Sequence, residues 1–162
     1  MGADFGLGVA EKDWLRTADI IPSPPTPLPP IDPQSVAGKV LPNLILDAEV
    51  SQTPGFRGAE VGAANGFSNA RALARMGSIV SLKGTVDGKQ YLGLKAIDQM
   101  LQERISGVDQ ILFFPIRFGL GVGLPVPQII TFIPEGKICF WGGWGGSILV
   151  MDLDRRMTIA YT

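Results

Sequence analysis

Two tryptophans and four glycines fill positions 141–146 of the stretch CFWGGWGGS, directly before the apolar run ILVMDLD. Glycine usually weakens a strand, so its use there indicates that another backbone or a ligand approaches closely. A glycine-rich strand can point backbone N–H groups at a developing oxyanion, because no Cβ is in the way. A tryptophan beside it can wall the space for an acyl or leaving group. Composition alone leaves a purely structural sheet edge as the alternative.

Two absences narrow the chemistry that this stretch can support. The 162 residues include no histidine, which removes Ser-His-Asp and Cys-His catalysis and most zinc sites. They include one cysteine, Cys139, so we expect no internal disulfide and no cysteine-rich metal cluster. We expect Cys139 to be a small, buried apolar residue on a strand.

The composition also bears on partners and location. Apolar residues make up 46% of a chain with a formal net charge of −1, which indicates a globular protein. No basic stripe is interleaved with aromatic residues, so nucleic acid is not expected as a partner. The apolar runs are too short for a membrane span. No secretory signal is visible at the N-terminus, and the compartment stays open with the cytoplasm as the default.

Three other patterns are weaker candidates for a site. The sequence around Ser68, GFSNA, approaches a nucleophile elbow, but no strand precedes it and no histidine serves as base, so we expect Ser68 to cap a helix. The glycines of FGLGVG (118–123) do not match a phosphate-binding motif and are expected on one face of a strand. Asp152 and Asp154 border a turn and are expected to be solvated.

The first 65 residues show little hydrophobic periodicity. Their segment IPSPPTPLPPIDP (21–33) is too rich in proline for a helix or a central strand, so we expect an extended surface loop. Docking of its PxxP patterns onto an SH3-type groove is the alternative. We interpret residues 1–65 as an extended, proline-rich loop region.

Residues 66–162 show clearer patterns of secondary structure. The segments 68–80 and 94–105 have apolar residues at helical spacing. The pair Asp87-Gly88 predicts a tight hairpin, and a second hairpin is predicted where DRR separates SILVMDL from MTIAYT. Helices followed by antiparallel strands predict the α+β class, with an antiparallel sheet and flanking helices.

Three segments resemble the serine β-lactamase-like esterases, the family VIII carboxylesterases, which are related to class C β-lactamases, D-alanyl-D-alanine peptidases and some fungal acyltransferases. The segments are EVGAANGFSNARALARM (60–76), IRFGLGVGLP (116–125) and CFWGGWGGSILVMDLDRRMTIAY (139–161). The resemblance implies that residues 66–162 form part of a β-lactamase/DD-peptidase-like (transpeptidase-like) fold. It also implies hydrolysis of a small-molecule ester, or acyl transfer, through an acyl-serine, with no metal and no organic cofactor.

Three motifs make the site in that family: S-x-x-K with the nucleophile, Y-x-N or Y-x-S, and a K-T-G-type strand motif that the esterases often replace by W-G-G. Trp141-Gly142-Gly143 matches the third motif. By this resemblance, Trp141 walls the pocket, and Gly142 and Gly143 permit close approach of the substrate. The backbone N–H of Trp144 is then a donor to the oxyanion hole.

The other two motifs do not occur. No serine of the sequence is followed by lysine three positions later, and neither tyrosine begins Y-x-N or Y-x-S. The resemblance therefore implies the C-terminal part of a hydrolase that lacks its nucleophile and base and is inactive alone. A non-catalytic derivative that serves binding or assembly is the alternative. Without the rest of the fold, apolar strands lose their cover, so we expect self-association through an exposed sheet edge.

Overall fold

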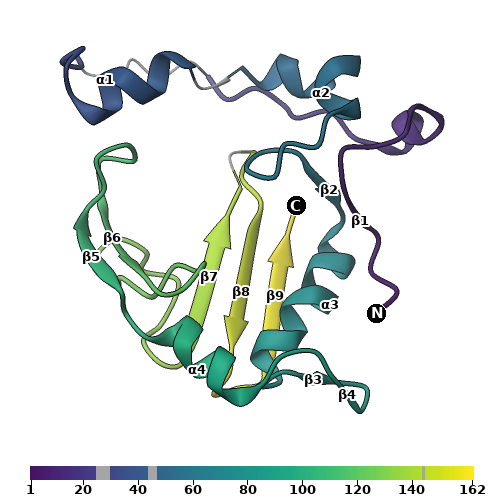
Figure 1. Ribbon diagram of the computed structural model, residues 1–162, viewed down its shortest axis with the longest axis vertical. Coiled ribbons are helices and arrows are strands. Elements are labelled where there is room, and N and C mark those ends of the chain that lie inside the picture. The colour runs from purple at the N-terminus through teal and green to yellow at the C-terminus, as the bar shows by residue number, and fades with distance from the viewer. Residues whose placement is uncertain (25–29, 44–46, 144) are drawn as a thin grey trace. The chain divides into compact units, whose positions relative to one another are not determined.

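The computed structural model describes residues 1–24, 30–43, 47–143 and 145–162 (Figure 1). They form two compact units. The sheet unit comprises Met1–Phe5, Ser68–Val108 and Phe114–Thr162, and the loop unit comprises Gly6–Phe67 and Asp109–Phe113. The domain boundary predicted between residues 65 and 66 stays a prediction. The proline-rich segment 21–33 falls partly outside the described residues.

The sheet unit is built on three antiparallel strands in the order β7-β8-β9 (Figure 1). They are β7 (Ile138–Gly142), β8 (Ile148–Asp152) and β9 (Met157–Tyr161). Their β-branched and aromatic residues suit a pleated surface that is covered by neighbours. The hairpin that joins β8 to β9 was predicted from the turn signal between them, and the structure confirms it.

One face of this sheet packs against helices α3 (Ala70–Ser81) and α4 (Leu94–Leu101). Gly77 lets α3 approach closely, because a Cβ there would lie 2.8 Å from Thr158 Cγ2 and 3.0 Å from Leu149 Cδ1. The hydroxyl groups of Ser81 and Thr158 lie 2.7 Å apart and add a partly buried polar contact between α3 and β9. The resulting core contains Val80, Ile97, Val122, Leu124, Cys139, Met151 and Leu153.

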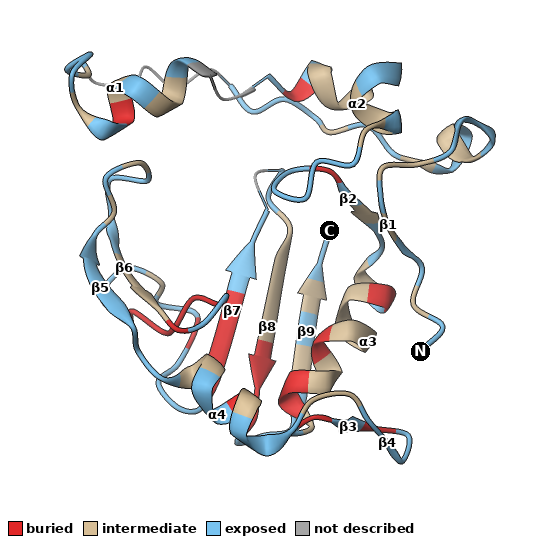
Figure 2. Cartoon of the chain, viewed as in Figure 1, coloured by how far each residue is buried: buried red, intermediate tan, exposed pale blue. Residues whose placement is uncertain are grey.

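On the opposite face, Ile138 and Phe140 of β7 are buried, whereas the residues of β9 are exposed; Figure 2 marks the burial of each residue along these strands. Ile133 packs there with Ile138 and Phe140 of β7. On β9, the three large side chains of this face are 42–66% exposed: Met157, Ile159 and Tyr161. These exposed side chains are compatible with the association that we expect, which stays a prediction.

Helix α4 is shorter than predicted, because the segment 94–105 was expected to be helical throughout. The helix ends at Leu101, and Ile105 begins β5 (Ile105–Val108), which pairs with β6 (Pro115–Phe118). The chain after β6 explains this end, since the N–H of Leu120 donates to the carbonyl of Met100 at 3.1 Å. A contact across 20 residues thus satisfies a carbonyl that the helix leaves free.

The expectation that the glycines of 118–123 share a strand face is wrong. Gly119 N–H donates to Val122 O at 3.0 Å, and Gly121 has a φ of +73°, so these residues form a turn. Only Gly123 returns to the sheet, where it bridges Phe118 of β6 and Phe140 of β7. This single residue therefore connects the β5–β6 hairpin to the three-stranded sheet.

Ser68 is not the N-cap that we predicted for α3. It ends β2 (Gly66–Ser68), and its hydroxyl donates to Asp4 O at 2.9 Å. The cap is Asn69, whose side-chain oxygen accepts the Ala72 N–H at 2.9 Å. The helix thus begins one residue later, with a cap residue of equal preference.

We predict that Asn69→Ala lowers the free energy of unfolding by about 1 kcal/mol, because an N-terminal N–H of α3 loses its acceptor. Urea unfolding followed by circular dichroism measures this loss. Ser68→Ala is the matched control and should change the stability less. A larger loss for Ser68→Ala than for Asn69→Ala would contradict this assignment of the cap.

A second tight hairpin, also predicted, lies between the two helices of the sheet unit. Its strands are β3 (Thr85–Val86) and β4 (Lys89–Gln90). The two residues between them have positive φ, with Asp87 at 49° and Gly88 at 74°. This is the backbone conformation that an Asp-Gly pair favours in a hairpin, so local turn chemistry sets the register.

The elements in the described part of the loop unit are short. They are β1 (Phe5–Leu7), which pairs with β2, η1 (Glu11–Arg16), α1 (Val36–Val40), η2 (Leu41–Asn43), η3 (Ala48–Gln52) and α2 (Pro54–Gly58). The side chain of Asn65 accepts the Val61 N–H and donates to the carbonyls of Phe56 and Ala59 at 2.6–2.9 Å. Among the helices in the described ranges, none combines the length and the apolar character needed to cross a bilayer.

Candidate functional site

The tryptophan–glycine stretch lies where β7 emerges from the core. The first three residues of β7 are buried, whereas Trp141 and Gly142 at its end, and Gly143 after it, are exposed (Figure 2). The structure therefore brings three of the four predicted site residues together at an open end of the sheet. The fourth, Trp144, lies outside the described residues.

The hydrogen bonds around β7 show which way its amides point. Phe140 exchanges two bonds with Gly123, at 2.8 and 3.0 Å, on the edge of β7 that faces away from β8. Gly143 donates its N–H to Ser147 at 2.8 Å, toward the other side. Because amides alternate along a strand, the N–H of Gly142 points to the same outer edge as that of Phe140.

Three glycines of the stretch, at positions 142, 143 and 146, allow the turn between β7 and β8. A Cβ on Gly143 would lie 2.3 Å from Ser147 Oγ, and a Cβ on Gly142 would lie 3.2 Å from Ser147 O. Gly146 has a φ of +92° and donates its N–H to Gly143 O at 3.1 Å. The close approach that glycine allows at position 143 is therefore already used within the turn.

Trp141 lies on the helix-covered face of the sheet, beyond the part that the helices bury. Its ring and the ring of Phe118 have centroids 5.0 Å apart and planes tilted by 47°. A Cβ on Gly123 would lie 3.2 Å from Trp141 Cε3, so the indole also rests on that backbone. The side chain is still 45% exposed, which leaves an apolar surface open beside the outer edge of β7.

Cys139 is fully buried on β7, as we expected. Burial raises the pKa of its thiol to about 12, because the thiolate would lose its solvation. A nucleophilic cysteine needs an exposed thiolate with a lowered pKa. Cys139 is therefore a core residue and not a candidate nucleophile.

The expectation that Asp152 is solvated is wrong. The residue is 3% exposed, and its carboxylate accepts the Arg155 N–H and guanidinium, both at 2.8 Å. Burial alone raises the pKa of Asp152, but these hydrogen bonds and the positive charge of Arg155 outweigh it, so the pKa lies below its usual value. Asp154 accepts the Lys137 N–H at 2.8 Å. Both carboxylates thus hold the chain together at the β8–β9 end of the sheet.

We predict that Asp152→Asn lowers the free energy of unfolding at pH 7 by about 1.5 kcal/mol, since hydrogen bonds to a charged acceptor are lost. Because the folded pKa is lowered, this stabilisation is present above the unfolded pKa near 3.9 and is lost as pH falls through the folded pKa. The difference between the two proteins should therefore shrink below about pH 4. Urea titrations at pH 7 and pH 3 measure it. Asp98→Asn, an exposed site on α4, is the control, and equal losses at both sites would contradict the prediction.

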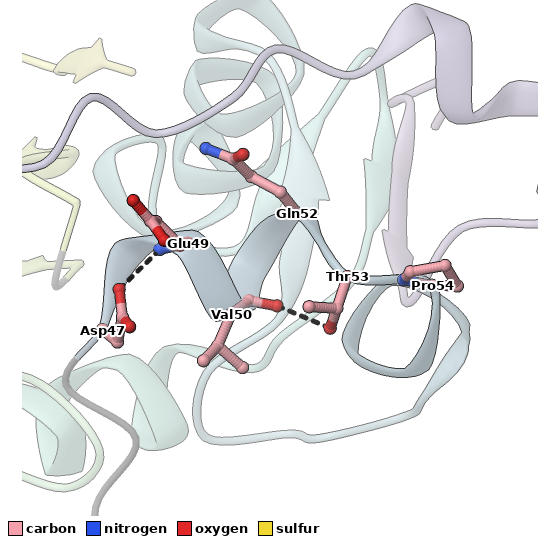
Figure 3. A pocket seen from close by; sticks show the side chains of 6 residues that line it. All are labelled: Asp47, Glu49, Val50, Gln52, Thr53 and Pro54. Carbon is pink, nitrogen blue, oxygen red and sulfur yellow. Dashed lines mark hydrogen bonds between the residues drawn. The ribbon is translucent and has the colours of Figure 1, made fainter.

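The loop unit carries a pocket of its own, lined by Asp47, Glu49, Val50, Gln52, Thr53 and Pro54 (Figure 3). Asp47 accepts the Glu49 N–H at 2.9 Å, and Thr53 donates its hydroxyl to Val50 O at 2.8 Å, so both side chains stabilise η3. Across the described ranges, no three acidic or cysteine side chains gather in a way that could hold a metal ion. The pocket includes no residue of the tryptophan–glycine stretch.

Comparison with known proteins decides the family. The family model described as Beta-lactamase matches residues 2–162. The chain belongs to the β-lactamase family. This is a family of serine hydrolases with esterases among its members, as the resemblance of the three sequence segments implied.

One relative of this β-lactamase-family chain is the protein described as Esterase/beta-lactamase LipL from Mycobacterium tuberculosis (strain ATCC 25618 / H37Rv). The two are 35% identical over 104 residues, which are 63% of this chain and 23% of LipL. A penicillin-binding protein homologue from Caulobacter crescentus superposes with a TM-score of 0.79 at 26% identity. That match covers 99% of this chain and 42% of the solved structure.

Two further solved structures share the fold. A family VIII carboxylesterase superposes with a TM-score of 0.82 at 22% identity, covering 98% of this chain and 40% of that structure. EstA from Arthrobacter nitroguajacolicus Rue61a gives 0.77 at 19% identity, covering 98% and 43%. The predicted partial β-lactamase-like α+β fold is thus confirmed. The chain spans about two fifths of these solved structures and less than a quarter of LipL.

Proposed function

We propose that this chain supplies the carbonyl-binding side of a serine ester hydrolase or acyltransferase. Trp141 walls the space for the acyl or leaving group, and Gly142 lets the substrate approach the strand, whereas Gly143 serves the turn to β8. The N–H of Trp144 is the donor that polarises the carbonyl. The observation that carries the proposal is the exposed end of β7, where the amide of Gly142 points to the outer edge beside the half-exposed indole of Trp141.

The chemistry follows from where charge develops. When a serine oxygen attacks an ester, the carbonyl oxygen becomes an oxyanion, and backbone N–H donors at about 3 Å stabilise it more than they stabilise the neutral carbonyl. Loss of one such donor typically costs about 10²–10³ in kcat. A glycine-rich strand end suits this task because no side chain blocks the approach of the substrate.

We further propose that the nucleophile and base come from sequence outside these 162 residues. The chain has no Ser-x-x-Lys and no Tyr-x-Asn or Tyr-x-Ser. Support also comes from the size of the matched structures, of which the chain covers only 40–43%. A chain with a carbonyl-binding edge and no nucleophile should not turn over esters on its own.

The experiment compares this chain with the product of the same gene extended upstream of Met1. Both are assayed with p-nitrophenyl butyrate and labelled with a fluorophosphonate, which reacts with activated serines. We expect no turnover above background for the chain, and turnover with labelling of a Ser-x-x-Lys serine for the extended product. Labelling of a serine within residues 1–162 would contradict the proposed location of the nucleophile outside these residues. An extended product without turnover would contradict the hydrolase itself.

The absence of both motifs favours a second candidate, a non-catalytic derivative that uses the fold for binding or assembly. It requires a natural start of translation at Met1 and ligand binding along residues 141–147 without turnover. Transcript sequencing upstream of Met1 separates the two candidates. An open reading frame that encodes Ser-x-x-Lys and Tyr-x-Asn or Tyr-x-Ser supports the hydrolase, whereas a start at Met1 supports the derivative.

A further inference from the structure

Trp141 contacts Phe118, the last residue of β6, and Gly123, which follows the next turn. The Phe118 ring lies against the indole with the two planes tilted by 47°, and a Cβ on Gly123 would lie 3.2 Å from Trp141 Cε3. The two residues are themselves paired through the bridge that Gly123 makes with Phe118 and Phe140. One side of the indole thus has fixed neighbours, while 45% of the side chain stays exposed.

Gly123 is required for its lack of volume. Its φ lies outside the left-handed region, so alanine could adopt the same backbone conformation. A Cβ would, however, lie 3.2 Å from Trp141 Cε3, 3.1 Å from Phe140 O and 3.3 Å from Phe140 Cζ. The carbonyl of Phe140 is bonded to Gly123 N–H and cannot move away easily, so the indole would be displaced.

Phe118 belongs to a segment that hydrogen bonds and an ion pair hold in place. Its carbonyl accepts the Arg104 N–H at 2.8 Å. The preceding Arg117 forms an ion pair with Glu103 at 2.7 Å and donates to Pro125 O at 2.8 Å. This arginine ties the strand before the turn to the segment after it. The position of Phe118 beside the indole is therefore fixed by contacts that do not involve Trp141.

We propose that Phe118 and Gly123 are positioning residues for Trp141, and that the aromatic shelf formed by Phe118 and Trp141 selects substrates with a flat or aromatic apolar group. The inference rests on the proposed function, because it takes the outer edge of β7 as the place of the ester carbonyl. With the indole lying on Gly123, its free surface is next to the outward amide of Gly142. An aryl leaving group or planar acyl group can stack there while its carbonyl reaches the strand.

The test uses the 162-residue chain labelled with 5-fluorotryptophan, whose three ¹⁹F resonances are assigned with tryptophan-to-phenylalanine variants. The probe is N-(4-nitrophenyl)butyramide, an unreactive amide analogue of an aryl ester. We expect it to shift the Trp141 resonance. Gly123→Ala and Phe118→Leu should change that resonance without ligand, increase its solvent isotope shift, and weaken binding of the probe about tenfold.

The controls change similar groups away from the shelf. Gly62→Ala adds a methyl group in open space, and Phe132→Leu alters an exposed phenylalanine. Both should leave the Trp141 resonance and the affinity as in the unmodified chain. N-butylbutyramide, which lacks the aryl group, should bind about tenfold more weakly than the aryl probe to the unmodified chain.

Three results overturn the inference, and they differ in what they imply for the proposed function. If the probe binds but Gly123→Ala and Phe118→Leu change neither the ¹⁹F resonance nor the affinity, the two residues do not position Trp141, and the proposed function is untouched. If the aryl and alkyl amides bind equally, the shelf selects nothing. If no tryptophan resonance responds to any amide, this edge binds no ester-like ligand and the proposed function fails with it.

Discussion

Gly84→Ala is expected to lower the free energy of unfolding by about 4 kcal/mol, a loss at the upper end for point substitutions. Gly84 has a φ of +92°, and a Cβ there would lie 2.0 Å from Leu92 O. Its backbone cannot move aside, because its N–H donates to Ile79 O and its carbonyl accepts the N–H groups of Tyr91 and Leu92. The collision is with main-chain atoms, so no rotamer change relieves it.

Gly88→Ala is the matched control for this prediction. Gly88 lies in the same β3–β4 region and also has a positive φ, at +74°, but a Cβ there meets nothing within 4 Å. It should cost about 1 kcal/mol, the ordinary penalty of an alanine in the left-handed region. Urea unfolding of the two variants separates the collision from the backbone penalty. Equal losses for both would show that Leu92 does not lie against Gly84.

Cys139 is expected to react with 5,5′-dithiobis(2-nitrobenzoate) about a thousandfold more slowly in the native chain than in the unfolded chain at pH 8. Burial raises the pKa of the thiol from an ordinary value near 9 to about 12, which reduces the reactive thiolate fraction by that factor. Full burial also blocks the reagent. Since the chain has a single cysteine, the signal is unambiguous. Rapid reaction under native conditions would contradict the burial of β7.

The same thiol makes stability depend on alkaline pH. Its folded pKa is raised, so its contribution is complete below the unfolded pKa near 9 and is lost as pH rises from there to about 12. Over that range the unfolded chain loses the proton while the folded chain keeps it. Cys139→Ala, which has no titrating thiol, should show a smaller loss of stability across this range in urea titrations.

The elements that could be predicted from the sequence are those set by neighbouring residues. The Asp87-Gly88 hairpin follows from a turn that needs two positive φ values in succession. The β8–β9 hairpin follows from two apolar strands around a polar turn. The burial of Cys139 follows from its place in an apolar strand. In each case the sequence pattern that supports the prediction lies within a few neighbouring positions.

The errors arose where distant residues decide the structure. The end of α4 at Leu101 depends on Leu120, and no helix signal between positions 94 and 105 contains that information. Asp152 reads as a solvated turn residue, yet it ends β8 opposite Ile138 of β7 and is buried there. Ser68 and Asn69 are both good caps, and the competing bond from Ser68 to Asp4 selects between them.

The candidate site likewise contains residues that could be predicted from the sequence and residues that depend on long-range contacts. Trp141 and Gly142 could be chosen from composition and motif, because the type of residue is itself the signal. The contribution of Phe118 could not, since its contact with Trp141 exists only after the chain has turned at 119–122 and returned at Gly123. The alternating glycines of residues 118–123 drew attention to this segment, but they were interpreted as a strand, whereas the chain forms a turn there.

The single-residue bridge at Gly123 has a consequence for how this family tolerates changes in length. An insertion or deletion between Phe118 and Gly123 would move another residue into the bridge and turn its side chain into Phe140 or Trp141. The longer connection from residue 127 to 136 forms no such bridge in the described structure, although Ile133 within it is buried. Among homologues, gaps should therefore accumulate in that later connection, while the count of residues from β6 to the bridge stays constant.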